Sequence, residues 1–403
     1  MKPSFLSLII SFIILIGCNK HSSEKQPETP ILKFDLDFTP RKPDSEGYSV
    51  SLAPFIDSVS CIKLETGNDF LIKRINWIEQ FNDMFYILDK ELNQLFVFDT
   101  KGRFKFNVGA KGKGPKETLE LTDFTIDRKN NLLYTWDNGL RKILIFDARN
   151  GEYLSQFKID GVCRSLLSYG RDTFLVYSAQ RPNKGINIDL NHNLFIMTKD
   201  YKIINKFLPI DKYMAYISTW QCKFSSYDDL NMIIPIWSNT VYQIKKEECK
   251  PRYYLDFGKY NIPLRIFEEY NKEPDLMKVR LESFNKLYKA IRHKYVYFIH
   301  NYCETDNFIY FNFYYSRKRF CLLYNKKNKK ETNRQYVAID IDSIKFPIFD
   351  FFKAEGDYLV SYAQPGSLNY FKDKISSNSK FKKTFEAASE TDNPILFLMH
   401  LKK

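Results

Sequence analysis

The chain has 403 residues, of which 16% are aromatic, and it carries a formal net charge of +13. This length allows a large core, and the abundance of Phe and Tyr favours pleated strands over helices. A basic chain can indicate a nucleic-acid partner. Here the lysines are scattered or gathered in turns such as 325–330, so we interpret the charge as a solvated surface and expect no nucleic-acid partner.

The first residues of the chain have the form of a lipoprotein signal. An apolar run at residues 5–16 is too short to span a bilayer as a mature helix. It ends in Leu-Ile-Gly-Cys at residues 15–18, which resembles the lipobox of bacterial lipoproteins, where the signal is removed before a Cys that becomes lipidated. An ordinary signal peptide with a chance Cys is the alternative. We expect a signal peptide at 1–17 and, at 18–33, a lipidated Cys18 followed by a polar tether.

Lipidation at Cys18 would hold the mature protein on a membrane of the cell envelope, stably if several acyl chains are attached. Asn19 occupies the position where an inner-membrane retention signal usually has Asp, and by this resemblance we expect the outer membrane, with a periplasmic or surface orientation left open. The other cysteines are widely spaced, without CxxC, which argues against a zinc site. We expect buried free thiols, with disulfides as the alternative, for Cys61, Cys163, Cys222, Cys249, Cys303 and Cys321.

A repeat organises the rest of the chain, which we expect to form one domain over 34–403. Residues 85–99 and 133–147, 48 positions apart, share an apolar strand, a polar turn and a second apolar strand ending in Asp. A repeat of this length built from short strands predicts the blades of a β-propeller. We expect six four-stranded blades, at about 72–108, 123–159, 162–208, 220–257, 296–338 and from 348 to the C-terminus.

Two further features complete the predicted ring. The last blade is one strand short, so we expect the N-terminal strand Val59–Leu64 to join the final strand Ile395–Leu401, which would close the ring and remove its free edges. Residues 264–293 break the strand pattern, because their apolar residues recur at three- and four-residue steps as in a helix. We therefore expect a helical insertion between blades four and five, on or beside the mouth of the channel.

Together these features resemble a family of six-bladed β-propeller lipoproteins of gut-type bacteria, related to NHL-repeat propellers. The resemblance is carried by the lipobox at Cys18, the strand pairs ending in Asp99 and Asp147, the loop 108–117 and the terminal strand after 392–394. It covers nearly the whole mature chain and implies the fold and the envelope location. It implies no activity, because this family has no agreed one and propellers host unrelated functions.

No motif in the sequence indicates a catalytic site. The glycine-rich, basic segment 109–115 lacks the residue order of a phosphate-binding loop, and we interpret it as an inter-blade loop that requires positive φ. Asp89, Asp99, Asp137 and Asp147 recur in phase with the repeat, and we interpret them as caps of turns rather than acid–base pairs. The five His residues form no repeat-phased set, so we expect no cofactor, while a carboxylate-and-amide metal site in the channel stays open.

The loops between the second and third strands of each blade lie on the same face as the inter-blade connections, and the longest irregular segments gather there. Binding residues concentrate on loops held by a rigid scaffold. We therefore expect a monomeric, lipid-anchored, non-enzymatic binding protein for a peptide, protein or glycan. The alternative is a propeller hydrolase or lyase with a channel metal. Candidate ligand-binding residues on this face are Lys113, Asn138, Arg141, Arg181, Trp237 and Arg317.

Overall fold

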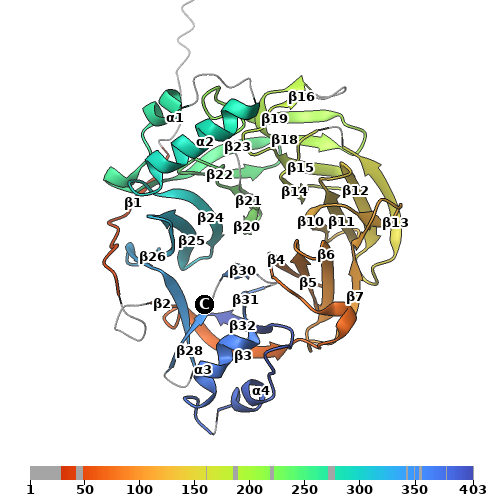
Figure 1. Ribbon diagram of the computed structural model, residues 1–403, viewed down its shortest axis with the longest axis vertical. Helices are drawn as coiled ribbons and strands as arrows, with labels where there is room; N and C mark the ends of the chain where they lie inside the picture. The colour runs from red at the N-terminus through yellow and green to blue at the C-terminus, as the bar shows by residue number, and fades with distance from the viewer. Residues whose placement is uncertain are drawn as a thin grey trace, which may run out of the picture.

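The chain folds as an all-β propeller, as the sequence predicts, with its sheets arranged around a central channel (Figure 1). Cys18, the expected signal peptide and most of the expected tether lie outside the described residues. No helix among the described residues is long and apolar enough to cross a membrane. The computed structural model describes residues 29–41, 49–159, 161–184, 189–217, 222–270, 277–341, 344–348, 350–353, 356–377 and 379–402.

The first three sheets each contain four antiparallel strands, ordered from the channel outward (Figure 1). They comprise β4 (Trp77–Phe81), β5 (Met84–Asp89), β6 (Gln94–Asp99) and β7 (Phe104–Val108); β10 (Leu121–Asp127), β11 (Leu132–Asp137), β12 (Lys142–Asp147) and β13 (Tyr153–Lys158); and β14 (Ser165–Ser168), β15 (Thr173–Tyr177), β18 (His192–Thr198) and β19 (Ile203–Pro209).

The later sheets are less regular, because three of them recruit strands from the N-terminal segment. They comprise β20 (Ser225–Tyr227), β21 (Leu230–Ile233), β22 (Thr240–Lys245), β23 (Glu248–Asp256) and β1 (Ile31–Lys33); β24 (Tyr297–Glu304), β25 (Phe308–Tyr315), β26 (Lys318–Asn325) and β27 (Lys330–Arg334); β29 (Ile344–Ile348), β28 (Tyr336–Ile341) and β2 (Ser49–Ser51); and β30 (Phe351–Lys353), β31 (Tyr358–Ala363), β32 (Ile395–Leu401) and β3 (Ile56–Lys63).

The expected count of six blades is wrong, because the described residues form seven sheets of three or more strands. The additional sheet is β2-β28-β29. The sequence pattern predicts that residues 335–339, most of which are apolar, form the outer strand of the fifth blade. In the structure β27, with the polar sequence Lys-Glu-Thr-Asn-Arg, takes that place, and β28 pairs instead with β29 and β2. A polar edge strand has no apolar periodicity, so the sequence pattern does not reveal it.

The core lies between neighbouring sheets, and strand periodicity explains why. All six residues of β5 are buried. Side chains alternate along a strand, so Phe85 and Ile87 pack toward the β30-β31-β32 sheet, while Tyr86 and Leu88 pack toward the second sheet. A strand that is apolar on both faces is therefore what a propeller requires, and it distinguishes these sheets from a sheet with one solvated face.

The N-terminal segment closes the ring as the sequence predicts. β3 pairs antiparallel with β32, from Ile56 opposite Leu401 to Lys63 opposite Ile395, so strands from the two ends of the chain share one sheet. A second contact was not predicted: β1 adds to the outer edge of β23 in parallel. The N-terminal segment therefore adds an outer strand to three sheets, and contacts β27 of a fourth, before the chain enters β4.

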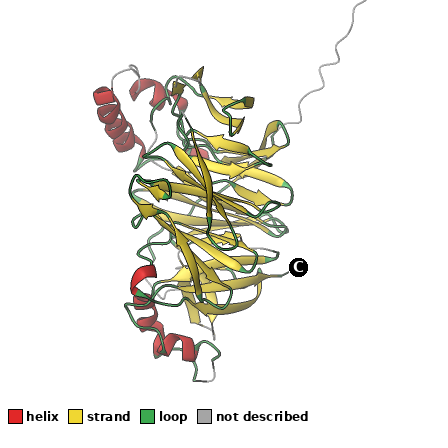
Figure 2. Ribbon diagram, turned by 90° about the vertical axis from the view of Figure 1, so that its right-hand side faces the viewer, coloured by secondary structure: helices red, strands yellow, loops and turns green. Residues whose placement is uncertain are grey.

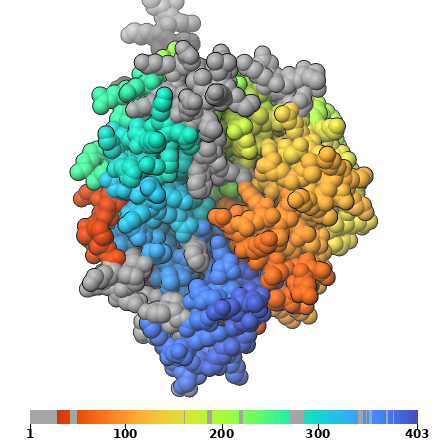
Figure 3. Space-filling model, viewed as in Figure 1, coloured from red at the N-terminus to blue at the C-terminus, as the bar shows by residue number. Residues whose placement is uncertain are grey.

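The described helices gather on one face of the ring (Figure 2). α1 (Leu264–Tyr270) and α2 (Met277–Ile291) lie between β23 and β24, where the sequence predicts an insertion. α3 (Pro365–Lys372) and α4 (Lys382–Glu386) lie between β31 and β32. Figure 3 shows this helix-bearing face. The remaining short elements are β8 (Ala110–Lys111), β9 (Glu117–Thr118), β16 (Asn183–Lys184), β17 (Asp189–Leu190) and the 3₁₀ turns Asn68–Phe70 and Gly258–Tyr260.

Candidate functional site

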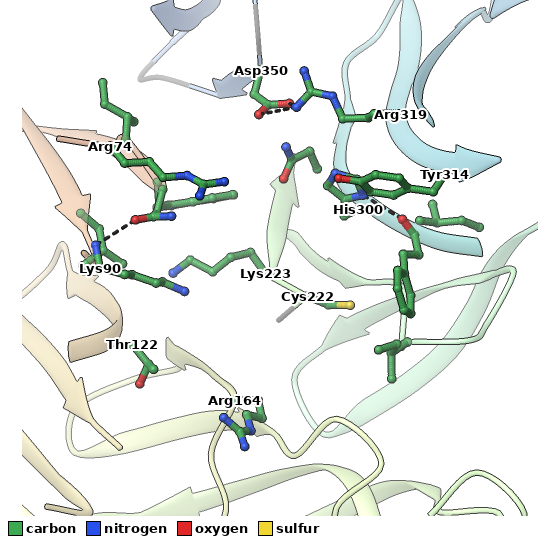
Figure 4. A pocket seen from close by; sticks show the side chains of 18 of the residues that line it. Arg74, Lys90, Thr122, Arg164, Cys222, Lys223, His300, Tyr314, Arg319 and Asp350 are labelled. Carbon is green, nitrogen blue, oxygen red and sulfur yellow. Dashed lines mark hydrogen bonds and ion pairs between the residues drawn. The ribbon is translucent and has the colours of Figure 1, made fainter. Parts of the chain in front are cut away.

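A cavity of about 800 Å³, here called the channel chamber, occupies the channel at the helix-bearing face. Six sheets contribute residues at or just before the start of their first strands, and none of its described lining residues belongs to the β2-β28-β29 sheet. The lining is cationic. Asp350 is the one carboxylate among the described lining residues, against six basic side chains: Arg74, Lys90, Arg164, Arg181, Lys223 and Arg319 (Figure 4).

The buried carboxylate of Asp89 positions two of these cations. It accepts hydrogen bonds from the backbone N–H groups of Lys73 at 2.7 Å and Arg74 at 2.9 Å, which fixes the segment before β4 against the end of β5. The Lys90 backbone N–H donates to Asn76 Oδ1 at 2.8 Å. Arg74 and Lys90 are thus held side by side at the chamber wall, and burial lowers the pKa of Lys90 to about 8.

The other repeat-phased aspartates have the same capping role, which confirms their interpretation as structural. Asp137 accepts hydrogen bonds from the backbone N–H groups of Leu119 at 2.9 Å and Leu140 at 3.0 Å. Asp99 and Asp147 accept from backbone N–H groups of the turns that follow them. Because these carboxylates satisfy turn donors, they belong to the scaffold.

Lys223 lies at the inner end of the chamber. Its ammonium forms an ion pair with the fully buried Asp123, which also accepts a hydrogen bond from the Leu166 backbone N–H at 2.8 Å. The same ammonium lies 5.1 Å from the ring centroid of Trp77 and 5.2 Å from that of Phe124, within cation–π range. Contacts to the first two sheets thus hold the Lys223 side chain, which precedes the first strand of the fourth sheet, across the channel.

Arg319 and Asp350 form the opposite wall. An Arg319 guanidinium nitrogen lies 3.2 Å from Asp350 Oδ2 (Figure 4). Asn312 Nδ2 donates to Asp350 Oδ1 at 2.7 Å. Asn312 in turn accepts from the Tyr310 hydroxyl at 2.8 Å. The one carboxylate in the described lining is therefore engaged by protein donors, and the chamber surface keeps an excess of positive charge.

The first strand of the fifth sheet is irregular where it lines the chamber. The pairing of β24 with β25 shifts register on both sides of His300, and Phe298 and Asn301 have positive φ of 50° and 51°. His300 Nδ1 lies 2.8 Å from the Phe298 carbonyl oxygen, and its ring stacks on Tyr314 with centroids 5.6 Å apart. Bulges and strained backbone cluster at functional sites, where they redirect side chains. Here they turn Phe298, Ile299, His300 and Asn301 all toward the chamber.

The helical insertion supports the chamber wall from the helix-bearing face. Leu287 and Ile291 of α2 are fully buried and pack in one cluster with Trp237 and Phe298. Phe298 also lines the chamber, and its ring lies 4.6 Å from that of Trp237. A helix of this length needs such packing to be stable in water. The insertion thus lies beside the channel mouth, and its deletion would expose an apolar wall.

The glycine-rich loop 109–115 has a structural role, as the sequence suggests. Gly109 has φ of 98°, and a Cβ there would come within 2.8 Å of the Asn93 carbonyl oxygen. The Gly114 backbone N–H donates to Glu117 Oε2 at 2.7 Å, and Lys142 Nζ donates to the Gly114 carbonyl at 3.1 Å. The chain's own carboxylate therefore takes the donor that a bound phosphate would need.

The residues lining the chamber do not fit a channel metal. The described residues contain no group of three or more His, Cys, Asp or Glu side chains placed to hold a metal ion. Six basic side chains around one space also oppose the entry of another cation. Cys222 is a free thiol whose pKa burial raises to about 12, so it is protonated and a poor nucleophile. All six described cysteines are free, and four of them are buried.

The candidate residues predicted from the sequence fall in different places. Arg181 lines the chamber. Trp237 is buried, and its indole N–H donates to the Ile217 carbonyl, so it packs beneath the insertion. Asn138 is half-buried and donates to Glu120 Oε2 at 2.6 Å. The last three are exposed and are not among the described lining residues of the chamber: Lys113, Arg141 and Arg317.

Sequence reasoning did not find most of the chamber cations, although a signal for three of them is present. Arg74, Arg164 and Lys223 stand one to three residues before the first strands β4, β14 and β20. A cation that recurs at this position in the repeat would point into the channel in several sheets. It escapes notice because these first strands are short or weakly apolar, so their starts are hard to place from sequence.

The fold and the chamber define an all-β propeller with a cationic channel. A family described as "Domain of unknown function (DUF4934)" matches residues 39–400, and the chain belongs to this family. No curated protein matches the chain. It is similar to a solved protein of Bacteroides fragilis NCTC 9343 that is predicted to be exported, with 19% identity and a TM-score of 0.72 over 88% of this chain and 99% of that one. A DUF4221 member from Bacteroides vulgatus shares 10% identity with a TM-score of 0.48, over 86% and 97%.

Proposed function

We propose that this protein is an exported, lipid-anchored propeller that binds an anionic ligand in the channel chamber without converting it chemically. One observation carries the proposal: six basic side chains surround a single space in which Asp350 is the one described carboxylate. The cavity of about 800 Å³ lies within the range of small-ligand sites, roughly 300–1,000 Å³. The proposal locates the expected binding site in the channel chamber and assigns its ligand a negative charge.

The electrostatics of the chamber favour carboxylate, phosphate or sulfate groups. Arg and Lys donate charge-assisted hydrogen bonds to such groups, and a concave wall of one charge sign concentrates the potential that attracts them. Lys223 pairs with Asp123, Arg319 with Asp350 and Arg74 with Glu91, so at least three of the six charges are offset within the protein. Six basic side chains and one carboxylate nevertheless line the chamber, and this balance favours an anionic ligand. The ligand would be a small anion, or the anionic end of a peptide or glycan that enters from the helix-bearing face.

The proposed location has two supports. The sequence at 15–18 resembles a lipobox, and the similar protein of Bacteroides fragilis is itself predicted to be exported. On this basis we propose that Cys18 carries lipid. Because Asn19 rather than Asp follows it, we also propose that the mature protein sits on the outer membrane. The partner then belongs to the envelope or its surroundings, which agrees with a peptide or glycan source for the anion.

Binding of citrate tests the proposal directly. A chain that begins at Asn19 keeps every described contact of the closed ring, so it can be purified without detergent. Calorimetric titration should show binding at low salt that weakens as NaCl screens the chamber charges. Arg164→Gln should weaken binding about tenfold or more, as expected for one charge-assisted hydrogen bond.

The matched control is Arg171→Gln. Arg171 is exposed in the turn between β14 and β15, at the opposite end of the same sheet from Arg164. This variant makes the same charge change and should leave citrate affinity unaltered. Absence of citrate binding at low salt, or equal losses in both variants, would contradict a specific anion site in the chamber.

A further inference from the structure

The channel continues beyond the chamber into a second cavity of about 370 Å³. Its lining comes from residues further along the same first strands, including Ile78 of β4 and Ile126 of β10. Trp77, Lys223 and Asn301 line both cavities, so the two spaces meet at these side chains. The second cavity is therefore an inner extension of the chamber along the channel axis.

The chemistry changes at this junction. Aromatic and aliphatic residues make up about half of the lining of the second cavity, among them Phe124, Ile126, Leu166, Phe351 and Phe352, and polar residues such as Ser168, Ser226 and Asn231 make up much of the rest. Its charged side chains are paired within the protein, since Arg128 lies 3.1 Å from Glu79 and Lys223 pairs with Asp123. Aromatic rings flank the ammonium of Lys223, which places a cation at the boundary between the cationic chamber and a space whose wall is partly apolar.

We propose that the ligand is an amphipathic anion, with its charged group in the channel chamber and an unbranched apolar tail extending past Trp77 into the second cavity. This inference rests on the proposed anion site and adds the nature of the rest of the ligand. A purely polar anion would fill only the chamber and leave the apolar part of the second cavity's wall in contact with water. A tail buried there gains the free energy of removing its methylene groups from water.

A chain-length series tests the tail. Sodium butanoate, hexanoate, octanoate and decanoate are titrated calorimetrically into the chain that begins at Asn19, at fixed pH and ionic strength, beside citrate. Affinity should rise by up to about fourfold per methylene, until the second cavity is filled. Octyltrimethylammonium, which has the same tail but a cationic head, should not bind. Equal affinity across the series, or equal binding of the cationic analogue, would overturn the inference of an apolar tail. The proposed anion site would still be supported if citrate binds.

Filling the second cavity provides an independent check. Ser168→Phe adds a ring to its wall from the third sheet, and Ser226→Phe does so from the fourth. Each should abolish the dependence on chain length and leave citrate affinity unchanged. Circular dichroism identifies a variant that fails to fold, and the other variant is then used for the test. A folded variant with an unaltered series would overturn the proposed tail site, and failure of all anions to bind wild type would instead refute the proposed function.

Discussion

Glu304→Gln should destabilise the whole ring, because Glu304 joins the fourth and fifth sheets. Its carboxylate is fully buried at the end of β24 and accepts two hydrogen bonds from Arg252 of β23, both at 2.8 Å. Lys326 Nζ donates to it at 2.8 Å and the Tyr302 hydroxyl at 2.9 Å. The substitution leaves two cations without their buried counter-charge.

Removing one partner of a buried ion pair costs about 3–5 kcal/mol. The side chains of Arg252 and Lys326 are 16% and 21% exposed, so water can partly solvate them and we expect about 3 kcal/mol, near the lower end of that range. This is a large share of a typical free energy of unfolding, about 5–15 kcal/mol. Urea denaturation followed by tryptophan fluorescence measures the loss at neutral pH.

The pH dependence gives a second readout. Burial opposes ionisation of Glu304, but hydrogen bonds from Arg252 and Lys326 outweigh it and lower its pKa. A lowered folded-state pKa stabilises the protein above the unfolded pKa, and this contribution is lost as pH falls through the folded value. The difference between wild type and Glu304→Gln should therefore be greatest near neutrality and shrink in acid.

The control is Glu248→Gln, which makes the same change in a pair with Lys250 whose side chains are 66% and 62% exposed. Screened surface pairs contribute little, so this variant should unfold like wild type. If Glu304→Gln were no less stable than Glu248→Gln at neutral pH, the reasoning that the buried triad ties the two sheets together would be refuted.

Three further predictions concern the ring, the anchor and the chamber. Phe397 is fully buried in β32 and its ring packs on Phe346 and Phe385, so Phe397→Ala should lower the free energy of unfolding by about 3–5 kcal/mol in one cooperative transition. Leu398→Ala, at a half-buried position, should lower it less. Separate melting of one sheet would argue against closure of the ring by β32. Cys18→Ala should abolish fatty-acid labelling, and labelling that persists would exclude Cys18 as the lipid site. Citrate affinity should fall as pH rises through about 8 because Lys90 loses its proton there, and Lys90→Gln should remove that step; an unchanged step would assign it to another group.

The regular part of the fold follows from sequence periodicity, whereas the site depends on closure of the ring. Residues 85–99 and 133–147 form strands with apolar side chains on both faces, and in the structure they are the middle strands of the first two sheets. β27 and β2 are polar or very short, so no apolar period marks them, and the number of sheets was therefore underestimated.

The chamber could not be assembled from sequence, because Arg74 and Arg319 meet only after the ring closes. Arg74 follows Lys73, and Arg319 follows Arg317 and Lys318, so in the sequence neither differs from a cation of a basic surface turn. Trp237 illustrates the reverse error: its residue type suggested a binding surface, but its position places it under α2, where it supports the insertion. The exposure of Trp237 decides between these two roles, and it depends on the insertion folding back over the loop that contains Trp237.

The direction of β1 sets the face of the ring from which the N-terminal segment approaches. β1 runs parallel to β23, whose last residue, Asp256, leads toward α1 on the helix-bearing face. Pro30 therefore approaches the ring from the opposite face, where the C-terminal end of β32 also lies (Figure 2). A lipid attached upstream of Pro30 would draw that rear face toward the bilayer and turn the mouth of the channel chamber outward. Solutes would then reach the chamber from the aqueous side without competing with the charged head groups beneath the protein.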